Sequence, residues 1–122
     1  PARRTKPARA RDVKVNVYNA TRRAGLAGAV SDQLEDRGFR LRKVANDPTD
    51  RDVKGVAEVR HGTKGRAAAL TLRAHVPGAV LVKDRRKTAV VDLALGSRFR
   101  QLATTREAAV ALRRQARTGA RC

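Results

Sequence analysis

The sequence predicts an α/β (α+β) two-layer sandwich, in which two helices cover one face of a sheet of about five strands. Three observations support this class. Five short apolar-rich stretches predict strands, most of them by alternation of apolar and polar residues, two longer stretches repeat apolar residues at helical spacing, and each longer stretch lies between two short ones. The expected order is therefore β-α-β-β-α-β-β, made of two βαβ units and an extra strand, with a short C-terminal helix at the end.

The first βαβ unit begins with "VKVNVY", residues 13–18, whose three valines fall on one face of a strand. Residues 23–37 then carry an apolar stripe at helical spacing, and Gly38 follows as a C-terminal cap glycine would. The stretch "FRLRKVA", residues 39–45, alternates again and predicts the returning strand. One face of each strand is polar, so we expect a cover layer on the other face only.

The second unit repeats this plan after a polar loop. Residues 55–61 predict a strand, residues 62–76 a turn into a helix closed by Pro77-Gly78, and residues 79–84 the returning strand. A shift of 42 residues superimposes several positions of the two units, among them Val17 on Val59. The shift predicts two consecutive, similar units.

A cationic turn, "DRRK", leads into a fifth strand over residues 88–96. Asp92 on its second face indicates that this side of the sheet is not a second core. Thr104 and Glu107 have the spacing of a capping box ahead of a short helix. We expect residues 115–122 to fray.

The 122 residues have room for one domain with one modest core. We expect a flexible basic linker over residues 1–12, the folded domain over residues 13–102, and a helix with a basic tail over residues 103–122. More than half of the net charge of +18 lies in the two terminal segments of the chain. An arginine-rich composition that keeps the protein soluble explains this charge as well as a bound anionic ligand does.

Catalytic and metal-binding groups are scarce. The single cysteine, Cys122, excludes an internal disulfide and a multi-cysteine metal site. His75 falls near the end of the second helix, where a dipole or capping role is expected, and the carboxylates of loop 46–52 alternate with cations, which favours plain solvation. No H-x-x-x-H, C-x-x-C, G-x-S-x-G or Walker-type motif is present. We therefore expect no enzyme, no cofactor and no metal.

The two strand-to-helix corners, "NATRRAG" and "HGTKGRA", are the better candidates. Each sets a threonine and cations at an expected helix N-terminus, where free N–H groups and the helix dipole favour anions. The alternative, which the pattern favours, is that Asn19, Thr21 and Thr63 only cap helices and close turns, with the arginines in solvent. The candidate anion-binding residues are Asn19, Thr21, Arg22, Arg23, His61, Thr63, Lys64 and Arg66.

The runs "VKVNVYNATRRAGLAGAVSDQLEDRGF", "VAEVRHGTKGRAAAL" and "VVDLALGSRF" resemble the LytR C-terminal domain. Members of this family lie behind LytR-CpsA-Psr catalytic domains or stand alone in membrane-anchored actinobacterial envelope proteins. The resemblance implies a non-catalytic, extracytoplasmic domain that is held outside the membrane by an N-terminal helix and acts in envelope integrity. Its partner would be an envelope protein or an anionic wall polymer or lipid, and its oligomeric state stays open. Ala20 stands where the family has glycine.

An alternative function is a nucleic-acid-binding, ferredoxin-like module that uses the basic face of its sheet. Such platforms stack bases on two or three aromatic side chains, and here only Tyr18 qualifies. An enzyme of unrecognised type is a weaker alternative still. The residues of the expected sheet platform are Lys14, Asn16, Tyr18, Arg40, Arg42 and Arg60.

Overall fold

The computed structural model describes residues 6–49 and 52–120 of the chain. It contains five strands, three α-helices and two short 3₁₀ helices in the described residues. The elements are η1 (Ala10–Asp12), β1 (Lys14–Asn19), α1 (Leu26–Asp36), β2 (Arg40–Asn46), β3 (Ala57–His61), η2 (Thr63–Gly65), α2 (Arg66–His75), β4 (Val80–Lys83), β5 (Val91–Leu95) and α3 (Thr105–Ala120). The predicted fold class and order of elements are confirmed.

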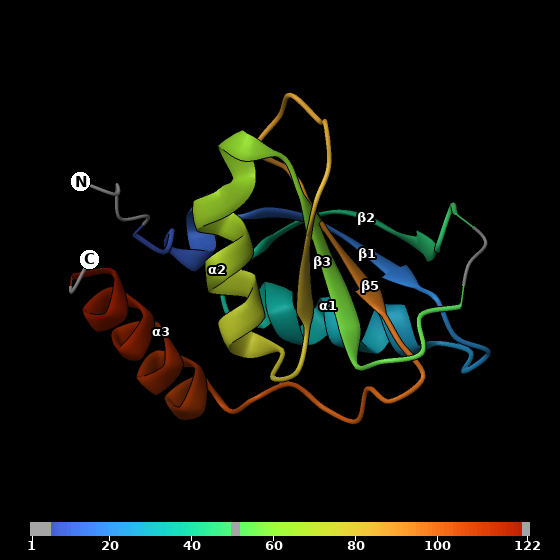
Figure 1. Cartoon of the computed structure of the whole chain (residues 1–122). Coiled ribbons are helices and arrows are strands. Elements are labelled where there is room, and N and C mark those ends of the chain that lie inside the picture. The colour runs from blue at the N-terminus through green and yellow to red at the C-terminus, as the bar shows by residue number, and fades with distance from the viewer. Residues whose placement is uncertain (1–5, 50–51, 121–122) are drawn as a thin grey trace.

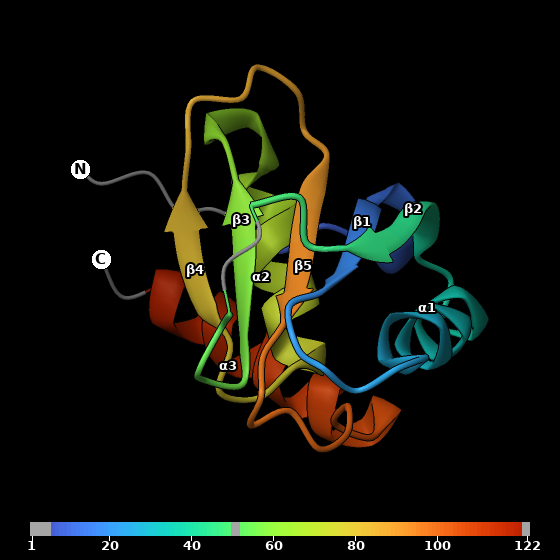
Figure 2. The same ribbon diagram turned by 90° about the vertical axis from the view of Figure 1, so that its right-hand side faces the viewer.

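The strands form one mixed sheet in the order β2-β1-β5-β3-β4, which Figure 2 shows across the view. β1 runs parallel to β2 and to β5, and β3 runs parallel to β4. β3 and β5 are antiparallel. Each βαβ unit is therefore parallel within itself, the two units run in opposite directions, and the last strand lies between them.

Both α1 and α2 lie on one face of the sheet (Figures 1 and 2). The valines of β1 at 13, 15 and 17 are fully buried there and join one cluster with side chains of both helices. Leu34 of α1 and Leu72 of α2, also fully buried, belong to this cluster. Burying such a side chain stabilises the fold by about 1.5 to 3 kcal/mol. The alternating pattern of each strand thus directs its apolar side chains to the single cover layer.

The predicted helix ends hold for α1 and α3. Gly38 has φ 97° and follows α1, while the Phe39 N–H donates to the Leu34 carbonyl at 3.1 Å, as in a glycine-closed helix end. The capping box is present, since the Thr104 N–H donates to Glu107 Oε1 at 2.8 Å and the Glu107 N–H donates to Thr104 Oγ1 at 3.1 Å.

The expectation that helix α3 is short is wrong. It spans Thr105–Ala120, so a large part of the segment expected to fray is helical. α3 packs along α2 (Figure 1), and Ala108 on its first turns is almost fully buried. Packing of one face supports a helix that local propensity alone leaves marginal. Cys122 lies outside the described residues. None of the described helices has the length and apolar character to cross a bilayer.

The expected linker over residues 1–12 is also corrected in its second half. The Ala8 N–H donates to the Ala67 carbonyl at 3.2 Å, and the Thr71 hydroxyl of α2 donates to the Ala8 carbonyl. Ala8 and Ala10 pack against the core, and η1 begins at Ala10. The small alanine side chains let this aperiodic segment approach α2 closely, so the folded unit starts before residue 13. Residues 1–5 lie outside the described part.

Candidate functional site

The first corner is a closed turn. Asn19 Oδ1 accepts hydrogen bonds from the Thr21 N–H at 2.9 Å and from the Thr21 hydroxyl at 2.5 Å. Thr21 Oγ1 accepts from the Arg23 N–H at 3.0 Å, and Asn19 Nδ2 donates to the Arg23 carbonyl at 2.7 Å. α1 begins only after Gly25, which has φ 81° and makes no side-chain cap. Thr21 therefore closes a turn, and the expectation that it caps the helix is wrong.

The two arginines of this corner differ. Arg23 donates to the Phe99 carbonyl at 2.6 Å and to the Gly96 carbonyl at 3.4 Å, which ties the corner to the segment after β5. Arg22 is exposed and makes no hydrogen bond or ion pair with the described residues. Ala20 is buried in a small cluster with Val53 and Ala94, so its methyl group is used in packing. Arg23 is thus a structural residue, and only Arg22 is left for a ligand.

The second corner is built differently. His61 is 1% exposed and its Nδ1 lies 2.9 Å from the Gly62 carbonyl, so the imidazole is not accessible to a ligand. Thr63 and Lys64 are exposed in η2, and Arg66 is exposed at the first residue of α2. The N-cap of α2 is Gly65 with no side-chain hydrogen bond, so the capping role expected of Thr63 is wrong.

The structure places these corners at opposite ends of the sheet. The first corner follows β1 and the second follows β3, and β3 runs against β5 whereas β1 runs with it. In the register, Asn19 pairs with Leu95, which also pairs with Ala57 at the start of β3. His61 is at the other end of that strand. The eight candidate residues therefore belong to two separate places rather than to one site.

The hollows at the two corners differ in charge. At the first corner, one hollow of about 430 Å³ is lined by Arg22 but also by Asp47 and Asp52. A neighbouring hollow of about 360 Å³ is lined by Arg22, Arg23 and Lys54 together with Asp52, so the charges at this corner are mixed. The one at the second corner, of about 560 Å³, is lined mostly by cations. These are Lys64, Lys83, Arg85, Arg86 and Lys87, together with Thr63 and Asp84.

Sequence reasoning missed the contribution of residues 83–87 to a site. The cationic turn "DRRK" was the available signal, but its position next to "HGTKG" depends on the parallel pairing of β3 with β4. The guanidinium of Arg86, in this segment, forms ion pairs with two carboxylates. Its Nη2 lies 2.6 Å from Asp84 Oδ2 and 2.8 Å from Asp92 Oδ2 on β5. Hydrogen bonds from Arg86 lower the pKa of Asp84 below its usual value, so this carboxylate stays ionised and paired.

The second face of the sheet is not the open platform that the nucleic-acid alternative requires. Arg60 is 6% exposed and donates to both carboxylate oxygens of Asp47 at 2.8 and 2.9 Å. It also donates to Glu58 at 3.0 Å. Tyr18 is 6% exposed, and burial raises its pKa. Tyr18, the only aromatic residue of the expected platform, and Arg60, one of its cations, are therefore buried in the fold. The expectation that Asp47 is simply solvated is wrong, because this carboxylate is buried against Arg60.

His75 is likewise a packing residue. Its Nδ1 accepts a hydrogen bond from Arg37 at 3.0 Å, and its ring meets Phe39 edge-on at a centroid distance of 4.9 Å. Burial lowers the pKa of His75 to about 4. A neutral imidazole adds no charge to the end of α2, which corrects the expected dipole role.

The described residues hold no group of three or more His, Cys, Asp or Glu side chains that could bind a metal ion.

Known proteins resemble this chain along most of its length. The model of the LytR_C family, described as LytR cell envelope-related transcriptional attenuator, matches residues 12–99. The cell envelope integrity protein Cei of Mycobacterium tuberculosis is 42% identical over 101 residues, which cover 80% of this chain and 46% of that protein.

A solved structure supports the same relationship. It is the soluble domain of a conserved hypothetical secreted protein from Mycobacterium marinum, with a TM-score of 0.80 and 36% identity over 88% of this chain and 74% of that one. The chain spans about half the length of its curated relative. The sequence resemblance is confirmed, and the chain belongs to the LytR_C family.

Proposed function

We propose that this chain is a non-catalytic, extracytoplasmic cell-envelope domain that supports envelope integrity by binding an anionic wall polymer or lipid head group. The name of the relative Cei and the family description support an envelope role. The secreted origin of the structural neighbour supports a location outside the cytoplasm. The first corner is a weaker candidate for the ligand, since Arg23 is committed to the fold and carboxylates line both hollows beside Arg22.

The observation that carries the proposal is the basic corner, which we define as Thr63, Lys64, Lys83, Arg85 and Lys87. Its four cations are exposed, line one hollow, and form no hydrogen bond or ion pair with the residues that the structure describes. Cations that meet at one surface attract a polyanion more strongly than the same cations dispersed. Near an anionic membrane each contributes on the order of 1 kcal/mol.

The backbone beneath the basic corner is fixed. The Asp84 N–H donates to the His61 carbonyl at 2.7 Å, which continues the pairing of β3 with the segment after β4. Gly62 packs so closely under this segment that an added Cβ would lie 2.2 Å from the Arg86 carbonyl oxygen. A fixed backbone lowers the ordering cost of binding, because only the cationic side chains have to be immobilised.

The test is sedimentation with vesicles of phosphatidylglycerol and phosphatidylcholine, and titration with a soluble poly(glycerol phosphate). A variant with Lys64, Lys83, Arg85 and Lys87 all changed to Gln should lose about tenfold or more in affinity for both probes. The matched control changes four exposed cations at the opposite end, and its binding should stay near that of the unaltered chain. The control residues are Arg22, Lys54, Arg98 and Arg100.

Salt separates the possible outcomes. Binding through the basic corner should weaken steeply as ionic strength rises, because exposed charges are screened. Equal losses in the two four-site variants would show that net charge matters and the basic corner does not. If the unaltered chain binds neither probe, the polyanion is excluded and a partner protein becomes the envelope component to seek.

A further inference from the structure

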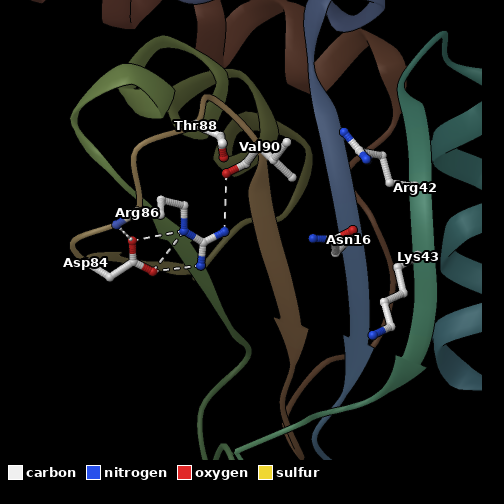
Figure 3. Close-up of a pocket in the computed structure, with 7 residues that line it drawn as sticks. All are labelled: Asn16, Arg42, Lys43, Asp84, Arg86, Thr88 and Val90. Atoms are coloured by element: carbon white, nitrogen blue, oxygen red, sulfur yellow. Dashed lines mark hydrogen bonds and ion pairs between the residues drawn. The ribbon is translucent and has the colours of Figure 1, made fainter.

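Another hollow lies on the face of the sheet that the helices leave uncovered. It measures about 710 Å³ and is bounded by β2 on one side and by the segment between β4 and β5 on the other, with β1 as its floor. Figure 3 shows this arrangement. We name it the sheet-face hollow, and its polar lining residues are Asn16, Arg42, Lys43, Asp84, Arg86 and Thr88.

A break in the strand register supplies two cations to this hollow. Val15 pairs with Leu41, but Asn16 pairs with Lys43, so Arg42 is an extra residue in β2. Consecutive side chains of a regular strand point to opposite faces, whereas a bulge sets two residues against one. Arg42 and Lys43 both line the hollow, and Figure 3 shows both side chains pointing from β2 toward β1. Neither makes a hydrogen bond or ion pair among the described residues.

The floor of the hollow presents an acceptor in a fixed orientation. Asn16 Nδ2 donates to Asp92 Oδ1 at 3.0 Å, and the second oxygen of Asp92 accepts from Arg86 at 2.8 Å. With its NH₂ group held on β5, the amide oxygen of Asn16 is turned toward β2 (Figure 3). The hollow thus combines two uncompensated cations with an acceptor that only an O–H or N–H group can satisfy.

The opposite wall is rigid. Arg86 also donates to both oxygens of Asp84 and to the Val90 carbonyl at 3.2 Å. These contacts hold the segment in place, and next to it Thr88 is exposed with a hydroxyl that can donate or accept. The wall is therefore formed before a ligand arrives.

We propose that the sheet-face hollow binds a hydroxyl-bearing anion, namely a sugar unit that carries a phosphate or carboxylate group. Arg42 and Lys43 pair with the anionic group, and the Asn16 amide oxygen accepts a hydrogen bond from a ring hydroxyl. A bare anion would satisfy the two cations but would leave the Asn16 oxygen facing like charge. The proposal rests on the anion-binding function proposed above, but it uses residues outside the basic corner.

The experiment is an isotope-labelled NMR titration of the chain with glucose 1-phosphate, glucuronate, inorganic phosphate and glucose. Signals of residues 15–17, 42–44 and 84–90 should shift with the first two probes. The better of these should bind about tenfold more tightly than inorganic phosphate, as one added hydrogen bond allows, and glucose alone should cause no shift. Which of the two binds more tightly separates a phosphate from a carboxylate ligand. Equal affinity for inorganic phosphate and both sugar anions would overturn the proposal.

Substitutions test which residues bind the anionic group of the ligand and which residue binds its hydroxyl group. R42Q and K43Q should each weaken glucose 1-phosphate about tenfold, the scale of one charge-assisted hydrogen bond. N16A should keep the affinity for inorganic phosphate and lose the advantage of the sugar phosphate, which a merely structural defect would not produce. R100Q, on an exposed arginine in the segment after β5, is the matched control and should bind as the unaltered chain does.

The four-site variant of the basic corner separates this proposal from the previous one. It should keep its affinity for glucose 1-phosphate while losing vesicle binding. Loss of sugar phosphate binding in that variant, together with full binding by R42Q and K43Q, would refute the sheet-face hollow and leave the basic corner standing. Full vesicle binding by the four-site variant, together with weakened glucose 1-phosphate binding by R42Q and K43Q, would refute the basic corner only.

Discussion

His75 should make the stability of this domain depend on pH in a range where few other groups titrate. The imidazole is 7% exposed and accepts a hydrogen bond from Arg37, and its pKa falls from 6.5 to about 4 on folding. The folded chain therefore resists protonation that the unfolded chain accepts. Between about pH 6.5 and pH 4 the unfolded state binds more protons, so the free energy of unfolding must fall as the pH falls through this window.

The size of this effect follows from the shift. The full difference of about 2.5 units corresponds to roughly 3 kcal/mol, reached only below about pH 4. At about pH 5 the loss relative to neutral pH should be about 2 kcal/mol. Because a domain of this size has a free energy of unfolding of about 5 to 15 kcal/mol, such a loss is readily measured.

The assay is urea unfolding followed by far-ultraviolet circular dichroism at about pH 7, pH 6 and pH 5, on the unaltered chain and on His75→Gln. Glutamine keeps an acceptor for Arg37 but does not titrate, so the variant should lose most of the decline between pH 7 and pH 5. Comparing slopes removes the constant cost of the substitution. An unaltered chain whose unfolding free energy stays level, or a variant with the same slope, would refute the buried neutral imidazole.

Three further substitutions, two of them paired with a control substitution, test the contacts described above by chemical unfolding. Asp47→Asn should cost about 3 kcal/mol, since it leaves its buried arginine with one partner fewer, whereas Asp52→Asn on the exposed part of the same loop should stay within about 0.5 kcal/mol; similar values for the two would disprove the buried ion pair. Gly62→Ala should destabilise by about 1 to 3 kcal/mol through overpacking, while Gly28→Ala, whose Cβ meets nothing within 4 Å in α1, should stabilise by up to about 1 kcal/mol. Arg23→Ala should lower the free energy of unfolding by about 1 kcal/mol through the lost carbonyl contacts; an unchanged midpoint would return this arginine to the list of free surface cations.

The candidate site shows where local patterns are insufficient. The sequence correctly indicated polar, cationic corners after two strands, and it indicated Arg42 on the polar face of its strand. It did not indicate the register shift that brings Lys43 to the same hollow, because a bulge is defined by the partner strand and not by the strand that carries it. It also could not distinguish Arg23, which is tied to the segment after β5, from its neighbour Arg22.

The sequence by itself determined the elements, because alternation of period two and apolar spacing of period 3.6 are local properties of the chain. It also indicated that the sheet needs one cover layer, since β1, β2, β3 and β5 each have polar residues on one face. Only the tertiary structure decided the direction of the second unit and the central place of β5. Those two features separate the corners, and the pairing of β3 with β4 sets "DRRK" beside "HGTKG". The physical reason is that strand order and direction arise from pairing between distant segments, whose hydrogen bonds are made by backbone groups that are alike in nearly every residue.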